Sequence, residues 1–199
     1  MRINKCWKPY VLVLFWGVAA CTPGARYERK LASELESGER HDSLFMGLYL
    51  GMSDKDFYTH CWELNREGLI RQGPANLTVQ YKTREELKHP ATMHFYPVFE
   101  DRRIVEMPVR FSYNGWAPWN GELSSENLAK DVLEWYKGIY GDDFLTVKHP
   151  EHGTAFVKVD GNRRITIFYE PDLYAWAIFT DLKSKMSSGD TLMGSPIIP

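Results

Sequence analysis

Apolar residues recur at helical spacing in two long stretches of the chain. In the first stretch, 54–67, the apolar stripe falls at i, i+4 and i+7 with aromatic neighbours, and its members are Phe57, Tyr58, Cys61, Trp62 and Leu64. This period places side chains on one face of a helix. Ser53 before the stretch and Asp56 three residues later form a capping-box arrangement, and Gly68 is a natural stop. The pattern predicts an amphipathic helix from residue 54 to residue 67.

A second long helix is predicted to begin after Ser124 or Ser125 and to end at Gly141. Its stripe consists of Leu128, Val132, Trp135 and Ile139, with Leu133 and Tyr136 beside it. A charged stretch, 26–36, carries a thinner stripe of Tyr27, Leu31 and Leu35. We expect this shorter helix to lie on the surface of the domain, because its apolar face is narrow.

Alternating apolar and polar residues follow each long helix and predict antiparallel strands. The candidate strands are 77–81, 92–99 and 104–113 after the first helix, and 144–147, 154–159, 164–169 and 174–180 after the second. Pro108 predicts that 104–113 is an edge strand or contains a bulge. Asp160 and Gly161 form a hairpin turn signal. The order of elements predicts an α+β fold of two tandem modules, each with one helix packed on an antiparallel meander.

The amino terminus has a different pattern. Arg2, Lys5 and Lys8 precede an uncharged apolar run, 10–18, and small residues follow it. This order is typical of a secretory signal. The run is too short to span a bilayer, which needs about 20 apolar residues.

The sequence V-A-A-C at 18–21 resembles the lipobox of bacterial lipoproteins. The resemblance implies cleavage before Cys21, which becomes the acylated first residue and ties the domain to a lipid membrane through two or more acyl chains. In such lipoproteins, an Asp directly after the acylated cysteine implies retention in the inner membrane, and a run of acidic residues there implies export to the cell surface. Here the next residue is Thr22, and no acidic run follows it. The resemblance therefore favours the outer membrane, with the domain facing the periplasm. An ordinary signal peptide, or an uncleaved anchor with an incidental cysteine, is the alternative.

Further resemblances concern the arrangement of the modules. Leu50-Gly51-Met52-Ser53 before a helix is similar to a motif of small envelope lipoproteins of the SmpA/BamE kind. The tandem order resembles the β-lactamase inhibitor protein, and the whole chain resembles Bacteroidetes lipoproteins of unknown activity.

The predicted boundaries are 1–20 for the signal peptide, 21–47 for the lipidated tether and short helix, 48–114 for the first module, 115–123 for a Trp-rich connecting loop, 124–183 for the second module and 184–199 for a flexible tail.

Charge and cysteine content narrow the classes of function. The formal net charge of −2 becomes about −5 when the three positive residues of the signal are removed, and this balance argues against nucleic acid as a partner. Cys6 leaves with the signal and Cys21 is acylated, so Cys61 has no cysteine partner for an intramolecular disulfide. We expect Cys61 to be a buried structural thiol, since neighbouring His60 points about 100° away on a helix and is poorly placed to activate it.

Catalytic and metal motifs are weak in this sequence. His149 and His152 flank a turn, and His89 and His94 bracket a strand start, but neither pair has an established zinc spacing. We expect these histidines to be exposed to solvent. The G-x-S-x-G nucleophile elbow is absent, so the sequence predicts neither an enzyme nor a cofactor.

The loop 115–121 carries the candidate binding residues of the sequence: Trp116 and Trp119, with Asn120 and Tyr113 able to support them by hydrogen bonds. The indoles could stack on a sugar or anchor a protein partner. Alternatively, they cover the edge of the core between the modules.

Three functions are open as hypotheses. The first is a non-enzymatic envelope lipoprotein that contacts another envelope protein or peptidoglycan. The second is a glycan- or small-ligand-binding lipoprotein, which predicts a concave aromatic pocket. The third is a hydrolase, which predicts His, Asp and Ser side chains in one cleft. A minor hypothesis is O-glycosylation at Ser43 or Thr191, because each follows an Asp and precedes an apolar residue.

Overall fold

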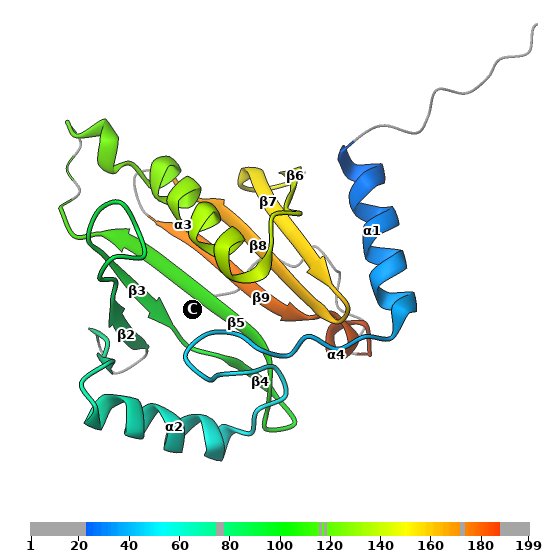
Figure 1. Ribbon diagram of the computed structural model, residues 1–199, viewed down its shortest axis with the longest axis horizontal. Helices are drawn as coiled ribbons and strands as arrows, with labels where there is room; N and C mark the ends of the chain where they lie inside the picture. Colours follow the sequence, from blue (N-terminus) through cyan, green and yellow to red (C-terminus); the bar gives the residue numbers. More distant parts are fainter. Residues whose placement is uncertain (1–22, 75–77, 116, 118, 172–173, 188–199) are drawn as a thin grey trace, which may run out of the picture.

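The computed structural model describes residues 23–74, 78–115, 117, 119–171 and 174–187 (Figure 1). The sequence predictions for the signal peptide 1–20, Cys21, Trp116, Thr191 and the tail beyond Ser187 lie outside the described residues and stay predictions.

The helices of the described part are α1 Pro23–Ser37, α2 Asp54–Arg66, α3 Ser125–Tyr140 and α4 Leu182–Ser187, with a 3-10 turn, η2, at Gly121–Leu123. The predicted caps of the two long helices are confirmed. The Ser53 Oγ accepts a hydrogen bond from the Asp56 backbone N–H at 3.1 Å, and the Ser124 Oγ accepts one from the Asn127 N–H at 3.3 Å. Gly141 follows α3 with a φ of 99°, a conformation that favours glycine.

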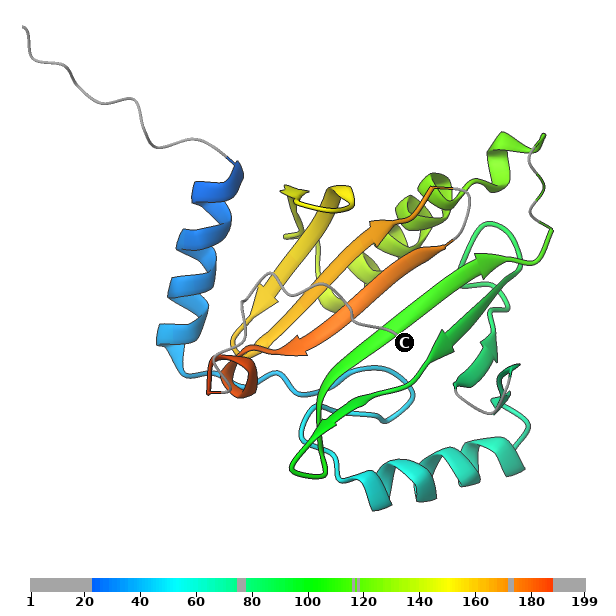
Figure 2. The ribbon, with the colours of Figure 1, turned by 180° about the vertical axis from the view of Figure 1, so that it is seen from behind.

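The strands are β1 Arg71–Gln72, β2 Val79–Lys82, β3 Ala91–Phe95, β4 Val98–Glu100, β5 Arg103–Tyr113, β6 Leu145–His149, β7 Gly153–Asp160, β8 Arg163–Tyr169 and β9 Ala175–Asp181. All of these strands pair antiparallel in one sheet (Figures 1 and 2). The order across the sheet is β1-β2-β3-β5-β9-β8-β7-β6, and β4 pairs with β5 off this path.

The two predicted modules meet at the centre of this sheet. β5 closes the first half and β9 closes the second, and these two strands pair from Glu106 with Thr180 to Phe111 with Ala175. Consecutive strands run outward from this seam on both sides. The predicted α+β class, with helices packed on antiparallel strands, is confirmed, and the two halves share one continuous sheet.

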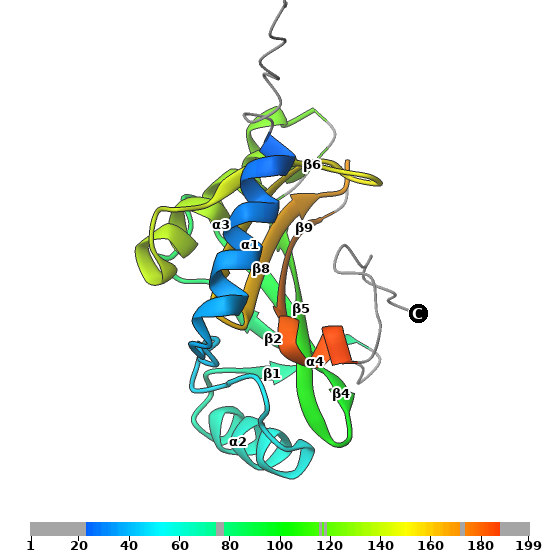
Figure 3. The ribbon, with the colours of Figure 1, turned by 90° about the vertical axis from the view of Figure 1, so that its right-hand side faces the viewer.

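Alternation along the strands gives the sheet an apolar layer on each face. On β9, Phe179 packs into a core with α3 and α2, while Trp176 faces a second core with α1. α3 lies across one face of the sheet, and Tyr27 and Leu31 of α1 pack into the core on the other face, at β6 and β7. Figure 3 shows α1 beside β6. The large first core explains how the domain folds without a disulfide.

Of the two alternatives that Pro108 predicts for this strand, an edge strand or a bulge, the edge strand is wrong. β5 lies between β3 and β9, and Pro108 is opposite Ile178 of β9. On the other side, the pairing with β3 stops at Val109 and the pairing with β4 starts at Glu106. Pro108 therefore falls where the predicted strand 92–99 divides into β3 and β4, so the ladder on this side is interrupted next to it, and a register shift follows between Val98 and Phe99 of β4.

The carboxyl end of the described chain also differs in detail. Helix α4 runs from Leu182 to Ser187 and so passes the predicted start of the tail at residue 184. Leu182 is fully buried in the second core, and its N–H donates to the Asn162 carbonyl at 2.7 Å. This contact holds the start of α4 against the turn between β7 and β8.

Candidate ligand-binding groove

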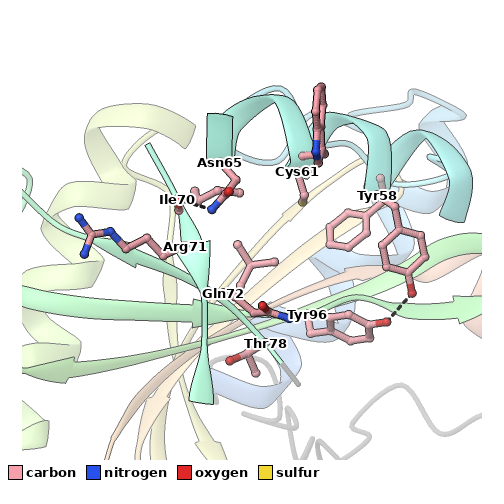
Figure 4. Close-up of a pocket in the computed structure, with 11 residues that line it drawn as sticks. Tyr58, Cys61, Asn65, Ile70, Arg71, Gln72, Thr78 and Tyr96 are labelled. Atoms are coloured by element: carbon pink, nitrogen blue, oxygen red, sulfur yellow. Dashed lines mark hydrogen bonds between the residues drawn. The ribbon is translucent and has the colours of Figure 1, made fainter. Parts of the chain in front are cut away.

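A groove of about 300 Å³ lies between α2 and the strands at the β1 edge of the sheet. Figure 4 shows Tyr58 and Cys61 of α2 on one side, facing Gln72 and Tyr96 on the other. Its volume is at the lower end of the range, about 300–1,000 Å³, that is typical of small-molecule sites.

The turn after α2 creates the second wall of this groove. Gly68 has a φ of 74°, and the N–H groups of Gly68 and Leu69 bond back to the Asn65 and Leu64 carbonyls. This C-terminal cap reverses the chain so that β1 runs back beneath α2. The Asn65 side chain then donates to the Ile70 carbonyl at 3.0 Å and ties the end of the helix to the start of β1.

Aromatic side chains form the exposed rim. Tyr58, Trp62 and Tyr96 are 53%, 62% and 38% exposed, which is high for rings of this size. The Tyr58 and Tyr96 hydroxyl oxygens are 2.6 Å apart and hydrogen-bonded. Buried Phe57 meets both tyrosine rings edge to face, with centroids at 5.5 and 6.0 Å, so the core fixes the rim. The Arg66 guanidinium lies 5.1 Å from the centre of the Trp62 ring.

Polar groups line the opposite wall. Arg71 and Gln72 form the two-residue edge strand β1, and both are exposed. The Thr78 Oγ is buried and has no hydrogen-bond partner among the described residues. Gly73 makes room for it, since a Cβ on Gly73 would collide with that oxygen. The groove therefore combines aromatic faces with an amide, a guanidinium and a buried hydroxyl that a ligand could engage.

Two titratable groups of the groove, Tyr96 and Cys61, stay neutral at pH 7. The hydrogen bond with the Tyr58 hydroxyl, together with burial, raises the pKa of Tyr96 to about 12. Burial raises the pKa of the Cys61 thiol to about 11. A neutral thiol is a poor nucleophile, so Cys61 is placed as part of the groove's apolar lining. Cys61 is half-buried at the groove, which corrects the expectation of a buried structural thiol.

This raised pKa predicts slow alkylation of Cys61. In the mature chain 21–199 with Cys21→Ser, we expect iodoacetamide at pH 7 to react with Cys61 on the order of tenfold to a hundredfold more slowly than with free cysteine. The rate should rise about tenfold per pH unit until the pH nears 11. Mass spectrometry of the timed reaction measures the rate, with free cysteine as the control. A plateau between pH 7 and 9 would contradict this assignment.

The candidate residues around the Trp-rich loop do not gather into a site. Tyr113 is buried, and its hydroxyl donates to the Asp131 carboxylate at 2.7 Å. Asn120 donates its backbone N–H to the Ala117 carbonyl at 2.9 Å. Trp119 is 88% exposed, so it does not cover the core as the alternative expected. Tyr113 is thus a core residue, and Trp119 stands alone among the described candidates as a surface ring.

His149 and His152 lie together, with ring centroids 4.8 Å apart, while His60 and His94 lie on other elements of the described chain. His149 is buried, which corrects its predicted exposure, and His152 stacks on Phe168 with ring centroids 4.1 Å apart. His60 shares a hydrogen bond of 2.6 Å with the Met46 carbonyl. Burial and the Arg110 charge lower the pKa of His94, which is half-buried on β3.

Sequence reasoning missed the groove. Tyr58 and Trp62 were interpreted as the widened edge of an apolar stripe, and the structure leaves both exposed. Their spacing of i, i+4, displaced by one residue from Phe57 and Cys61, is a signal that could have indicated a second aromatic face. The facing wall at β1 could not be inferred in the same way, since it depends on the turn at Gly68.

Comparisons with other proteins add no assignment. No protein-family model, curated protein or solved structure matches the chain. Within the described residues, no three His, Cys, Asp or Glu side chains gather as metal ligands would. No helix of the described part is long and apolar enough to cross a membrane.

Proposed function

We propose that this chain is a non-enzymatic envelope lipoprotein, anchored to the outer membrane through Cys21 and facing the periplasm, whose α2 groove binds a glycan or a similar small polar ligand. The observation that carries the proposal is the aromatic rim of Tyr58, Trp62 and Tyr96 facing the polar wall of Arg71 and Gln72. The lipobox resemblance supports the location, and the groove supports the binding role.

A sugar matches this arrangement chemically. The C–H faces of a pyranose ring are apolar and pack on aromatic rings, whereas its hydroxyl groups need donors and acceptors at the rim. Gln72 supplies both a donor and an acceptor, and Arg71 supplies donors only. The buried Thr78 hydroxyl adds a further group that a ligand or a water molecule can satisfy.

Binding is favoured over hydrolysis by the placement of the candidate catalytic groups. A hydrolase of the Ser–His–Asp type needs its base within hydrogen-bond reach of its nucleophile. The one histidine on α2, His60, is instead hydrogen-bonded to the Met46 carbonyl, and the Cys61 thiol is held neutral by burial. The groove therefore presents recognition groups without an activated nucleophile.

A protein partner is the second candidate function. Trp119 supports it, because an indole that is 88% exposed in a loop next to a helix start is suited to fill a pocket on another protein. The loop lies at the end of β5, away from α2 (Figure 1), so the two candidate surfaces can be tested separately.

Replacement of the rim should abolish most of the ligand affinity. We expect Tyr58→Ala/Trp62→Ala to weaken binding about 30-fold or more, because two stacking faces are lost and each 1.4 kcal/mol corresponds to tenfold. The measurement is a thermal-shift screen of neutral and N-acetylated oligosaccharides, peptidoglycan glycan fragments included, followed by calorimetry on each ligand that stabilises the protein.

Trp119→Ala is the matched control, since it removes an exposed indole at the other surface. It should leave oligosaccharide affinity unchanged. The groove proposal fails if no oligosaccharide stabilises the protein, or if the two variants bind equally well. In-cell crosslinking tests the second candidate, a protein partner. If an envelope protein is crosslinked to the parent chain and to the rim variant but not to Trp119→Ala, the protein-partner function is favoured.

A further inference from the structure

A second groove, of about 500 Å³, lies beside α1. Four of its lining residues, Arg26, Arg29, Lys30 and Ser33, fall at i, i+3, i+4 and i+7, so they form one stripe along the helix. The start of β6, with Asp143 and Leu145, forms the other side. Three cations and one carboxylate thus line this groove.

The carboxylate of the groove, Asp143, is shared between two lysines. The Lys30 ammonium lies 2.7 Å from the Glu34 carboxylate and 3.5 Å from that of Asp143, and Asp143 also pairs with Lys158. These charges largely offset one another within the fold. Arg26 and Arg29, both exposed, add positive charge toward the start of the helix. The Arg29 Nε donates to the Ala25 carbonyl at 3.1 Å, and this contact holds the guanidinium along the helix.

The packing of α1 fixes where this stripe points. Tyr27 and Leu31, one position on from Arg26 and Lys30, are 3% and 5% exposed and bury into the second core. The Tyr27 hydroxyl accepts a hydrogen bond from the Arg164 guanidinium at 3.4 Å. The helix therefore cannot rotate about its axis, and the cationic stripe stays at the groove beside the start of β6.

The groove also lies close to the proposed lipid anchor. One residue, Thr22, separates Cys21 from the first residue of α1. Cys21 and Pro23 are at most about 7 Å apart, and Arg26 and Arg29 follow within about 9 Å of helix rise. Both guanidinium groups are thus held within roughly two Debye lengths of a membrane surface at physiological ionic strength.

We propose that the α1 groove binds the phosphate headgroup of an anionic phospholipid and so fixes the orientation of the domain on the membrane. The inference rests on the proposed anchoring at Cys21 and goes beyond it, since an acyl anchor alone leaves the domain free to tilt. Guanidinium groups are suited to phosphate because they donate in a planar fork. Figure 1 places α2 at the opposite end of the molecule from the start of α1, so the α2 groove would face away from the membrane.

Vesicle binding of the mature chain 21–199 with Cys21→Ser tests this proposal, because every described residue is kept and acylation is removed. We expect sedimentation with phosphatidylglycerol-containing vesicles, weak sedimentation with phosphatidylcholine alone, and a steep fall with added salt. Arg26→Gln/Arg29→Gln should weaken binding about 25-fold, at about fivefold per charge. Arg26→Lys/Arg29→Lys should keep most of the affinity.

Lys55→Gln/Lys82→Gln is the matched control, since it removes two exposed charges elsewhere and should bind as the parent chain does. Equal losses in the two Gln variants, or equal binding to both vesicle types, would overturn the proposal. Competition by millimolar inorganic phosphate would also overturn it, by indicating a free-phosphate site. The mass of native Cys21 tests the anchor separately, and oligosaccharide binding tests the α2 groove separately.

Discussion

Alanine in place of Phe111 is expected to lower the free energy of unfolding by about 3–5 kcal/mol. Phe111 is completely buried on β5, at the seam where the two halves of the sheet meet. Its neighbours across the strands are Met93 of β3 and Ala175 of β9. The rings of Trp135 and Tyr136 from α3 meet it edge to face at 6.2 and 6.3 Å. Truncation therefore opens a cavity that rigid elements on three sides cannot close.

Urea unfolding followed by tryptophan fluorescence and by circular dichroism measures this loss. Phe111→Leu keeps most of the volume and should cost less than about 1.5 kcal/mol. Trp119→Ala removes a large ring from the surface and should change stability by less than about 0.5 kcal/mol. A loss below about 1.5 kcal/mol for Phe111→Ala would show that β5 is not the centre of the core.

The same experiment tests whether the two halves unfold together. Because β5 pairs with both β3 and β9, the two halves cannot separate without breaking the central ladder. We expect one cooperative transition, with the same midpoint by tryptophan fluorescence and by circular dichroism. Two transitions, with only one of them shifted by Phe111→Ala, would mean that the halves are independent domains.

Local signals explain why so much of the secondary structure could be predicted. The caps at Ser53 and Ser124 and the stop at Gly141 depend on a few adjacent residues, and the structure has each of them. Gly161 adopts a φ of 51° in the β7–β8 turn that the Asp-Gly pair predicts. Such features are determined by residues within one turn of each other, so the sequence indicates them directly.

Non-local pairing explains what could not be predicted. The contact between β5 and β9 joins segments about 70 residues apart, and no local pattern indicates it. The edge-strand interpretation of Pro108 was wrong for this reason, since the break opposite it lies between β3 and β4 and not at a sheet edge. Tyr113 was predicted to support the indoles of the loop by hydrogen bonding, but its hydroxyl instead donates to Asp131, which comes from α3.

The candidate site illustrates the same limit. The aromatic rim residues Tyr58 and Trp62 can be identified in the sequence, but their exposure cannot be predicted from it. That exposure depends on the distance between α2 and β1. The turn at Gly68 sets that distance through its bonds to Leu64 and Asn65. A groove between a helix and a sheet edge is therefore a tertiary property, even when each wall is predicted correctly.

Alanine in place of Asp160 is expected to cost about 3–5 kcal/mol, because it removes the carboxylate that two buried cations share. Its two carboxylate oxygens bind the Lys158 ammonium at 2.8 Å and the Arg163 guanidinium at 2.9 Å. The side chains of these two cations are only 5% and 7% exposed. Lys158 would retain Asp143, which is half-exposed, while Arg163 would keep the Ser43 carbonyl and the Tyr140 ring.

Glu134→Ala is the matched control for this change. It removes a carboxylate that lies 2.7 Å from Lys137 on the surface of α3, and it should cost less than about 0.5 kcal/mol. Asp160→Ala/Arg163→Met should recover part of the loss, since an apolar side chain replaces the buried charge that lost its carboxylate partner. Equal stabilities of Asp160→Ala and Glu134→Ala would contradict the assignment. The Asp160 carboxylate would then add no more stability than a surface pair, and the β7–β8 turn would have to be held by its backbone and by Asn162, which donates to Asp42 at 2.9 Å.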